Sequence, residues 1–512
     1  MPATAMPRAC VLSALAIKRA AAAEGAWSRV AVEEIEGMLE AIRECLDGRV
    51  LVHAPASDQQ ARQAWTRVVE EGQGGDLQVL ACETLKDAVR EAASAFQVEP
   101  EDVLAIAPPS VATWAAFATK CATALLCVKN PNEPDNDGSA NDDDCGAPTS
   151  PLEVLQVFAA RAAADAKPPR AVVGVAMDLK RWRALRRARL LPLLPARAPT
   201  DDDGNDENQA AVFTPLSLVL APLAPQLHAV DAVLHKATDK HPLASEADAD
   251  LDGQYTLSAR ADLHDACQRV LPSAKLLLDP WPNVCRVTSR ARMLRHVQQG
   301  GVAVPQWRGP LATAADVADA YASLGFPVLL KADSACGTPH AHDMCAVADA
   351  SGIPAALRSV PFPCVAMRLA GHGGSFFKCY CIDSASDKDA EVDQMWFHAT
   401  ARPSLPDPEA LFRDAGTAAV PFHALKSLPT ASPDAMPAPP VAALRAIAVR
   451  LASTFGLRLF GFDAILDTAS SLLVVDVNYF PSFGGAPGAP SALQRMVRAS
   501  LRQNLRKRAR GV

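Results

Sequence analysis

The sequence predicts an α/β protein of more than one domain, and three observations predict it. The chain has 512 residues, which is too long for a single hydrophobic core. The segment 1–130 alternates short apolar runs with helical patterns, which indicates a doubly wound parallel sheet. From Gly325 onward, several apolar runs follow one another closely enough for antiparallel pairing.

The first domain is expected over residues 1–130. Its first strand is predicted in "CVLSALAI", which then enters an Ala-rich helix. Helical stretches such as "AVEEIEGMLEAIRECL" separate the strands that follow. Those strands are predicted at 49–54, 77–82, 102–108 and 122–130. An acidic loop and linker is expected over 131–168.

Composition excludes several classes of protein. Two segments, "NEPDNDGSANDDDC" and "TDDDGNDENQ", hold eleven acids and are expected to be solvated loops. Without these acids the net charge of −7 becomes +4, which suits an anionic ligand but is too weak for nucleic acid. No apolar run reaches the ~18 residues that span a bilayer. The thirteen cysteines contain no CxxC pair, which favours reduced thiols in a cytosolic or nuclear protein.

The later elements follow the same reading. Strand–helix starts are predicted at "PRAVVGVAMDLKRWRALRRARLL" and "VDAVLHKATD". The helix "PVAALRAIAVRLASTFG" is expected to end at Gly456. Six further strands are predicted in "FPVLLKAD", "PCVAMRLA", "GSFFKCYCID", "DQMWFHATAR", "RLFGFDAILD" and "LLVVDVN".

The last two of these strands carry acids where a buried strand should have none. If "TASS" (468–471) joins them, Asp463 lies directly opposite Asp476, and Asn478 shares the face of Asp476. Opposed carboxylates repel each other, so two of them beside an amide oxygen favour a cation. Oxygen donors suit Mg²⁺, which often shares its ligand shell with a substrate phosphate. The alternative is that one acid is protonated and hydrogen-bonded, or that both face solvent.

Basic and glycine-rich elements lie upstream of this hairpin. Lys331 ends an apolar strand and precedes the small-residue loop "ADSACGTPHAH", an arrangement that can hold a phosphate. "GHGGSFFKCY" adds a second glycine-rich turn, with Lys378 on the strand that follows. The histidines here lack zinc-like spacing, so we expect anion contacts or surface positions for His340, His342 and His372.

Seven stretches together resemble one known family, the inositol 1,3,4-trisphosphate 5/6-kinases, also called inositol tetrakisphosphate 1-kinases. They occur in the family's order and cover roughly residues 170–490. The stretches are "VVGVAMDLKR", "VDAVLHKATD", "LLLDPWPNVCRVTSRARML", "LLKADSACGTPHAHDM", "HGGSFFKCY", "ARPSLPD" and "FGFDAILDT…LLVVDVNYFPSF". The resemblance implies an ATP-grasp kinase fold, with an N-terminal α/β domain over 169–285 and the central and C-terminal subdomains over 286–512.

The resemblance also assigns candidate site residues. The Mg²⁺ ligands would be Asp463, Asp476 and Asn478. ATP would contact Arg290, Lys331, Met367, Leu369 and Ser404, with adenine held by segment 365–372. Inositol phosphate would contact Lys180, Arg181, Lys236, His342, Lys378, Asn478 and Ser482. The catalytic residues would be Lys378 and His342. Because Met367 and Arg368 replace a usual Gln and a common Glu, an altered affinity for ATP is expected.

The resemblance implies an ATP- and Mg²⁺-dependent kinase that phosphorylates a free hydroxyl of inositol tris- or tetrakisphosphate. Phosphoryl transfer requires mainly positioning and charge neutralisation, and no general base stands out. The alternatives are an ATP-grasp carboxylate–amine ligase and a non-catalytic inositol-phosphate-binding protein. The cations of "LKR" and "LHK" favour a polyanionic acceptor, and the paired acids favour an enzyme. A cytosolic or nuclear monomer is expected, without nucleic acid or a membrane span.

The segment 1–165 lies outside this resemblance. Longer plant-type members of the family carry an extra N-terminal α/β domain. The stretch "EPEDVLAIAPPSVATWAAFATKCATALLCV" is faintly similar to a late motif of haloacid-dehalogenase-like domains. The acids that would hold Mg²⁺ in that motif are absent from "AIAPPS", so a non-catalytic domain is expected.

Overall fold

The structure is a computed structural model, and the chain divides into two compact units. One comprises residues 1–175 with 179–231, and the other 176–178 with 232–512. Each unit is described by itself. The structure describes residues 9–13, 50–53, 78–80, 103–107, 126–127, 171–177, 179–188, 190–191, 211–216, 226–227, 230–236, 276–336, 340–384, 395–421 and 437–509.

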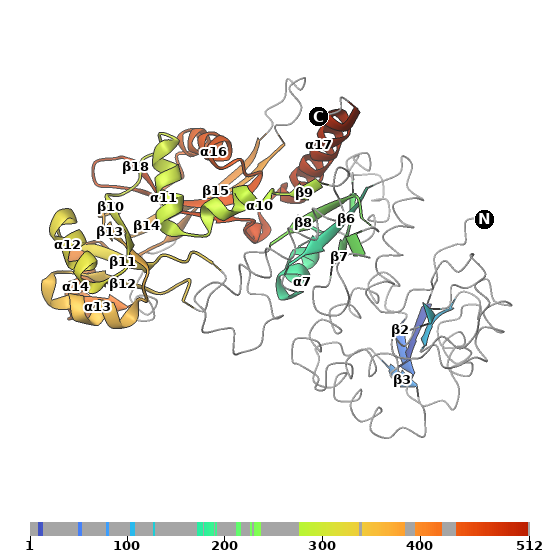
Figure 1. The fold of residues 1–512 in the computed structure, drawn as a ribbon, viewed down its shortest axis with the longest axis horizontal. Helices are drawn as coiled ribbons and strands as arrows, with labels where there is room; N and C mark the ends of the chain where they lie inside the picture. The colour runs from blue at the N-terminus through green and yellow to red at the C-terminus, as the bar shows by residue number, and fades with distance from the viewer. Residues whose placement is uncertain are drawn as a thin grey trace. The chain divides into compact units, whose positions relative to one another are not determined.

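The first unit begins with a parallel sheet, as the alternating pattern predicted (Figure 1). Its strands pair in the order β3-β2-β1-β4-β5. They are shorter than predicted and span β1 (Ala9–Ser13), β2 (Val50–His53), β3 (Gln78–Leu80), β4 (Val103–Ala107) and β5 (Leu126–Cys127). The helices expected between them and the acidic linker lie outside the described residues. That these strands form a separate domain stays a prediction.

A strand–helix–strand motif follows in the same unit. Strand β6 (Ala171–Ala176) leads into helix α7 (Leu179–Arg187), as "VVGVAMDLKR" predicted, and pairs in parallel with β7 (Ala211–Pro215). In the second unit, β8 (Ala232–His235) pairs in parallel with β9 (Leu276–Leu278). These strands are buried almost throughout, which explains their continuous apolar runs.

The second unit contains a five-stranded antiparallel sheet, referred to below as the central sheet. Its strands are ordered β10-β13-β11-β12-β16. Side chains from α12 (Ala314–Leu324) and α13 (Ile353–Ser359) share one core cluster with it, and α14 (Pro408–Ala415) contributes to another. The strands are β10 (Trp307–Leu311), β11 (Val328–Ala332), β12 (Met344–Val347), β13 (Cys364–Arg368) and β16 (Ala419–Pro421). Strands β10, β12 and β16 were not predicted, because they are short or interrupted by Gly-Pro.

A four-stranded antiparallel sheet, the C-terminal sheet, completes this unit (Figure 1). Its strands are ordered β15-β14-β17-β18. Helices α16 (Val441–Phe455) and α17 (Ala489–Ala509) pack against it, and α11 (Arg290–Gln299) packs against β18. The strands are β14 (Ser375–Asp383), β15 (Met395–Pro403), β17 (Leu459–Leu466) and β18 (Leu472–Tyr479), and all four were predicted.

Helix α16 ends as predicted at Gly456. This glycine is left-handed, with φ of 65°, and its N–H donates to the carbonyl of Ala452. Asn283 donates to the Gly456 carbonyl over 2.9 Å, and a Cβ on Gly456 would lie 2.8 Å from that amide nitrogen. Both the conformation and the close contact therefore require glycine. Among the described helices, none is long and apolar enough to cross a membrane.

Candidate active site

The acidic hairpin is formed by β17 and β18, and Asp463 lies directly opposite Asp476, as predicted. The turn that joins the strands was predicted one residue too short. Leu466 pairs with Leu472, so the turn spans residues 467–471 rather than 468–471. The carboxylate of Asp467 closes it by accepting hydrogen bonds from the N–H groups of Ala469 and Ser471.

A β-bulge restores the predicted pairing of the acids. Ala464 pairs with Val474, and the register then shifts so that Asp463 pairs with Asp476. Val475 is the extra residue of β18, and its side chain lines the cavity described below. The bulge therefore cancels the offset of the longer turn. It also places an apolar side chain beside the acids.

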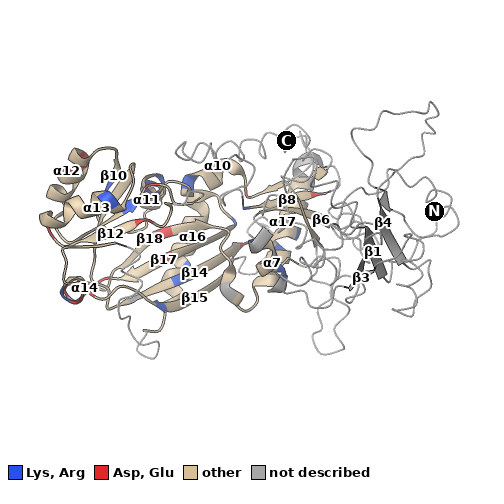
Figure 2. Ribbon diagram, turned by 90° about the horizontal axis from the view of Figure 1, so that it is seen from below, with Lys and Arg blue, Asp and Glu red and all other residues tan. Residues whose placement is uncertain are grey.

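A row of polar side chains crosses the C-terminal sheet at this level. Thr400 on β15 pairs with Lys378 on β14, Lys378 pairs with Asp463, and Asp463 pairs with Asp476. The Lys378 ammonium lies 3.5 Å from Oδ1 of Asp463. Paired residues in neighbouring strands point to the same face, so one face of this sheet presents a cation beside two carboxylates. Figure 2 colours the basic and acidic residues of the described chain on the ribbon, including those of this sheet.

Burial controls the charges of this row. It raises the pKa of Asp463 to about 6, Lys378 acts in the opposite direction, and the facing Asp476 raises it. Burial also lowers the pKa of Lys331, which reaches toward the acids from β11 of the central sheet; Asp476 and Asp463 favour its charged form. Two lysines from two sheets therefore flank the two carboxylates.

The chemistry of these side chains fits a divalent cation. Oδ1 of Asp476 is buried and has no hydrogen-bond partner among the described residues, whereas Oδ2 accepts from the amide of Asn478 over 3.0 Å. Within the described residues no group of three His, Cys, Asp or Glu side chains could hold a metal alone. A cation here would need further oxygens from water or from a substrate phosphate. Mg²⁺ typically takes its ligands in this way.

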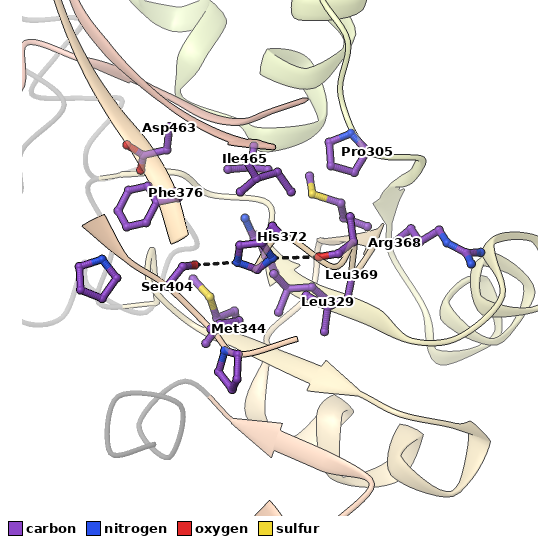
Figure 3. Close-up of a pocket in the computed structure, with 17 residues that line it drawn as sticks. Pro305, Leu329, Met344, Arg368, Leu369, His372, Phe376, Ser404, Asp463 and Ile465 are labelled. Carbon is purple, nitrogen blue, oxygen red and sulfur yellow. Dashed lines mark hydrogen bonds between the residues drawn. The ribbon is translucent and has the colours of Figure 1, made fainter. Parts of the chain in front are cut away.

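A cavity of about 330 Å³ lies beside this row, between the central and C-terminal sheets (Figure 3). Its wall is mostly apolar and has a few polar groups, the composition expected of a small-molecule site. Five predicted site residues line it: Lys331, Met367, Leu369, Ser404 and Asp463. Other lining side chains were not singled out from the sequence: Pro305, Leu329, Met344, Phe376, Ile465 and Val475.

His372 holds Ser404 at this cavity, and Figure 3 shows both contacts of its ring. Nδ1 lies 2.9 Å from the carbonyl oxygen of Ala370, and Nε2 lies 3.0 Å from the Ser404 hydroxyl. A carbonyl can only accept, so Nδ1 donates, and in the neutral ring Nε2 accepts the hydroxyl proton of Ser404. Ser404 then presents lone pairs, which suit a donor such as a ribose hydroxyl. His372 is buried, which excludes the surface position among the two alternatives expected for it, and an anion contact stays a prediction.

Backbone contacts order the segment that should hold adenine. The Asp407 carboxylate accepts from the N–H groups of His372 and Gly373, each over 3.1 Å. The N–H of Leu369 donates to the carbonyl of Pro327, and the N–H of Arg368 donates to the carbonyl of Gln306. Both N–H groups therefore already have acceptors within the protein. The Arg368 side chain points away from the cavity and donates to the Leu324 carbonyl.

Arg290, a predicted phosphate contact, is the first residue of α11 and is buried. Its Nη1 donates to the carbonyls of Ala332 and Ser334, and Nη2 donates to that of Ala341. Nε has no partner among the described residues. The guanidinium thus ties α11 to β11 and to the loop that follows it. Direct contact with a nucleotide phosphate stays a prediction.

Lys236, a predicted substrate contact, is also buried. Its ammonium donates to the carbonyl of Tyr479, and it lies 5.7 Å from the centre of that ring. Tyr479 in turn donates to Leu278 and accepts from the N–H of Asp279. Lys236 therefore fastens the end of β18, one residue beyond Asn478. Its contact with substrate stays a prediction.

The remaining predicted contacts are spread over the chain. His342 is exposed in the turn before β12, where the neighbouring His340 pairs with Asp343 over 2.7 Å. Ser482 is exposed just after β18. Arg181 lies on α7 in the other compact unit, as does Lys180, whose side chain lies outside the described residues.

The two antiparallel sheets, with a cavity between them that is lined by a buried lysine and by one of the two paired acids, define an ATP-grasp domain. Residues 298–497 match the family model of the inositol 1,3,4-trisphosphate 5/6-kinase ATP-grasp domain. This match confirms the predicted fold and, for this domain, the predicted family.

Known proteins with similar sequences carry related names. The chain is 27% identical over 338 residues to "inositol-tetrakisphosphate 1-kinase 6" of Oryza sativa subsp. indica, which covers 62% of this chain and 57% of that protein. It is 33% identical over 189 residues to "inositol-tetrakisphosphate 1-kinase 5" of Oryza sativa subsp. japonica, which covers 34% and 50%. The chain therefore spans about half the length of these curated relatives.

Solved structures are more distant. A RimK domain ATP-grasp protein from Sphaerobacter thermophilus is 16% identical, with a TM-score of 0.38, over 64% of this chain and 99% of that chain. At this level of sequence identity and structural similarity, the match shows nothing about the reaction.

Proposed function

We propose that the protein is an ATP- and Mg²⁺-dependent inositol polyphosphate kinase. It transfers the γ-phosphate of ATP to a free hydroxyl of an inositol tris- or tetrakisphosphate, as a 1,3,4-trisphosphate 5/6-kinase or 3,4,5,6-tetrakisphosphate 1-kinase does. The observation that carries the proposal is the row of Lys378, Asp463 and Asp476 beside the apolar cavity. The matched family model and the names of the relatives support it.

ATP occupies the cavity between the two sheets in this proposal. The purine lies among the apolar side chains, with Met367 and Leu369 on the β13 side and Ile465 on the β17 side. Ser404, whose hydroxyl donates its hydrogen bond to His372, accepts one from a ribose hydroxyl. Lys331 lines this pocket and interacts electrostatically with both acids, and in this proposal its charge offsets that of the phosphates.

Asp463, Asp476 and Asn478 would hold Mg²⁺. When bound, the ion neutralises charge on the ATP phosphates and holds them in place. Lys378 projects from the same face and orients a phosphate of the acceptor, so that a free hydroxyl of the inositol faces the γ-phosphate. Within this compact unit, Lys236 and His342 are the remaining cations proposed to contact the acceptor.

The test is an assay of purified full-length protein with Mg-ATP and a panel of inositol phosphates and amino acids, with products resolved by chromatography. A kinase yields ADP and an inositol phosphate with one more phosphate group. A carboxylate–amine ligase yields an amide and inorganic phosphate instead. A protein that binds inositol phosphate without consuming ATP would exclude both reactions.

A further inference from the structure

His398 lies on the same sheet face as the polar row and is not used by the site described so far. It is two residues from Thr400 on β15 and pairs with Tyr380 on β14. The next positions across the sheet are Gly461 and Asn478. His398 is therefore one row further along the face than Lys378, diagonally opposite it. Diagonal neighbours of this kind lie about 7 Å apart.

Aromatic rings fix the position of this histidine. Its ring is nearly parallel to that of Tyr380, with 12° between the planes and 6.4 Å between the centres. It is also nearly parallel to the ring of Trp396, at 13° and 6.2 Å. The two neighbouring rings hold the orientation of the imidazole. Among the described residues no hydrogen bond to either nitrogen is present, and the side chain is half-buried rather than fully covered.

The turn after β18 limits the space beside His398. Phe483 packs against both Tyr380 and Trp396, and a Cβ on Gly461 would lie 3.2 Å from Pro481. This turn therefore covers much of the row to which His398 belongs. Toward Lys378 the face stays accessible, because the side chain of Lys378 is 35% exposed and that of Asp463 20%.

We propose that His398 is a further substrate-binding residue that donates a hydrogen bond to a phosphate of the inositol phosphate, next to the phosphate held by Lys378. This inference rests on the proposed function. The charged side chains of the polar row are Lys378, Asp463 and Asp476, and β14, which carries Lys378, lies between the strand of His398 and the strands of the two acids.

The test compares two substitutions in the full-length protein. His398→Phe keeps a flat ring between Tyr380 and Trp396 but removes the donor, whereas His398→Gln keeps a donor. His296→Phe is the matched control, because His296 on α11 also stacks on an aromatic ring, that of Phe455. We expect His398→Phe to raise KM for inositol 1,3,4-trisphosphate about tenfold, as the loss of one charge-assisted hydrogen bond would. The KM of His398→Phe for ATP and its kcat should stay within about twofold of wild type. His398→Gln should show a smaller rise in KM for the inositol phosphate, and the control variant should match wild type.

Binding measured without turnover provides a second readout. Calorimetry with inositol 1,3,4-trisphosphate and a non-hydrolysable ATP analogue should show the same tenfold rise in Kd for His398→Phe. Unchanged KM and Kd in a folded variant would overturn the inference, as would an equal rise for ATP. Failure of the proposed function looks different, since wild-type protein would then form no phosphorylated inositol product at all.

Discussion

Asp476 has a carboxylate oxygen, Oδ1, that is buried and unsatisfied within the described part of the chain. Such atoms are rare in folded proteins because each costs free energy. The opposed Asp463 adds repulsion between like charges. A cation bound between the two carboxylates would remove both costs. Substitution of one of these acids is therefore the most direct test of the proposed chemistry.

Asp476→Asn should abolish Mg²⁺-dependent turnover while the protein stays folded. Changes outside the ligand shell of a metal already cost about 10–100-fold, so loss of a ligand should cost at least about a hundredfold in kcat/KM. The melting temperature without metal should stay the same or rise, because one charge of an opposed pair is gone. Asp414→Asn on α14, an exposed acid, is the control. Near-normal kinase rates for Asp476→Asn at ordinary Mg²⁺ would refute the metal assignment.

A second buried acid, Asp279, controls stability rather than chemistry. It follows β9 and is 1% exposed. Its Oδ2 accepts from the N–H groups of Arg458 and Leu459 at the start of β17, and Oδ1 has no partner among the described residues. Burial raises the pKa of Asp279 to about 6; the two amides and the Arg458 charge act in the opposite direction, and Asp383 raises it.

The pH dependence of stability follows from this shift. In the unfolded chain an aspartate titrates near 4, so the folded state binds the proton more tightly. Ionised Asp279 therefore destabilises the fold above pH ~6, and this cost is relieved as the pH falls. The unfolding free energy of wild type minus that of Asp279→Asn should rise by about 1 kcal/mol from pH 7 to pH 5. Urea titrations of both proteins measure it, and a difference that is constant with pH would contradict the assignment.

At the scale of elements, one carboxylate holds the backbone of the segment between β13 and β14 in place. Asp407 accepts from the N–H groups of His372 and Gly373, and His372 in turn holds Ser404 at the cavity. Asp407→Ala should release this segment and raise KM for ATP about tenfold, the effect of about 1.5 kcal/mol. Asp407→Asn keeps one acceptor oxygen, so its rise in KM for ATP should be smaller. Equal KM values for ATP in wild type and the alanine variant would show that the segment is held by other contacts.

The hairpin shows which parts of an element can be predicted from sequence. The apolar runs placed strands β17 and β18 correctly, and the alternation of side chains along a strand put Asp476 and Asn478 on one face. The turn length was wrong by one residue, since turns and bulges depend on backbone geometry. The acids nevertheless pair as predicted, because the bulge at Val475 offsets the longer turn.

The candidate site could be predicted only in part, because some of its residues stand out in the sequence and others do not. The acids and Lys331 stand out because charged residues are unusual in apolar strands. Phe376, Ile465 and Met344 line the same cavity, but in the sequence they look like any core residue. Lys236 and Arg290 were expected to meet ligands, and their contacts with backbone carbonyls depend on segments far apart in the chain.

At the scale of the whole molecule, the central and C-terminal sheets and the cavity all belong to the second compact unit. The first sheet, α7 and β7 belong to the other unit, as does β6 up to Val175. The division therefore groups the parallel sheet formed by β1 to β5 with elements that the family resemblance assigns to the kinase. The predicted boundary lies elsewhere, in the linker before position 169.

Removal of the segment 1–165 decides between these boundaries. We predict that a fragment covering 166–512 is soluble, folds and keeps ATP-dependent activity, because the motifs of the kinase resemblance begin only at Val172. The segment 1–130 is also of ordinary domain size and could bury a core of its own. Loss of an interdomain surface should lower the melting temperature without changing the inositol phosphate product, which chromatography identifies.

If a folded fragment forms a different product isomer or none, the N-terminal segment helps to build the active site. An insoluble fragment alongside an active full-length protein would place the boundary elsewhere in the chain and contradict the predicted one.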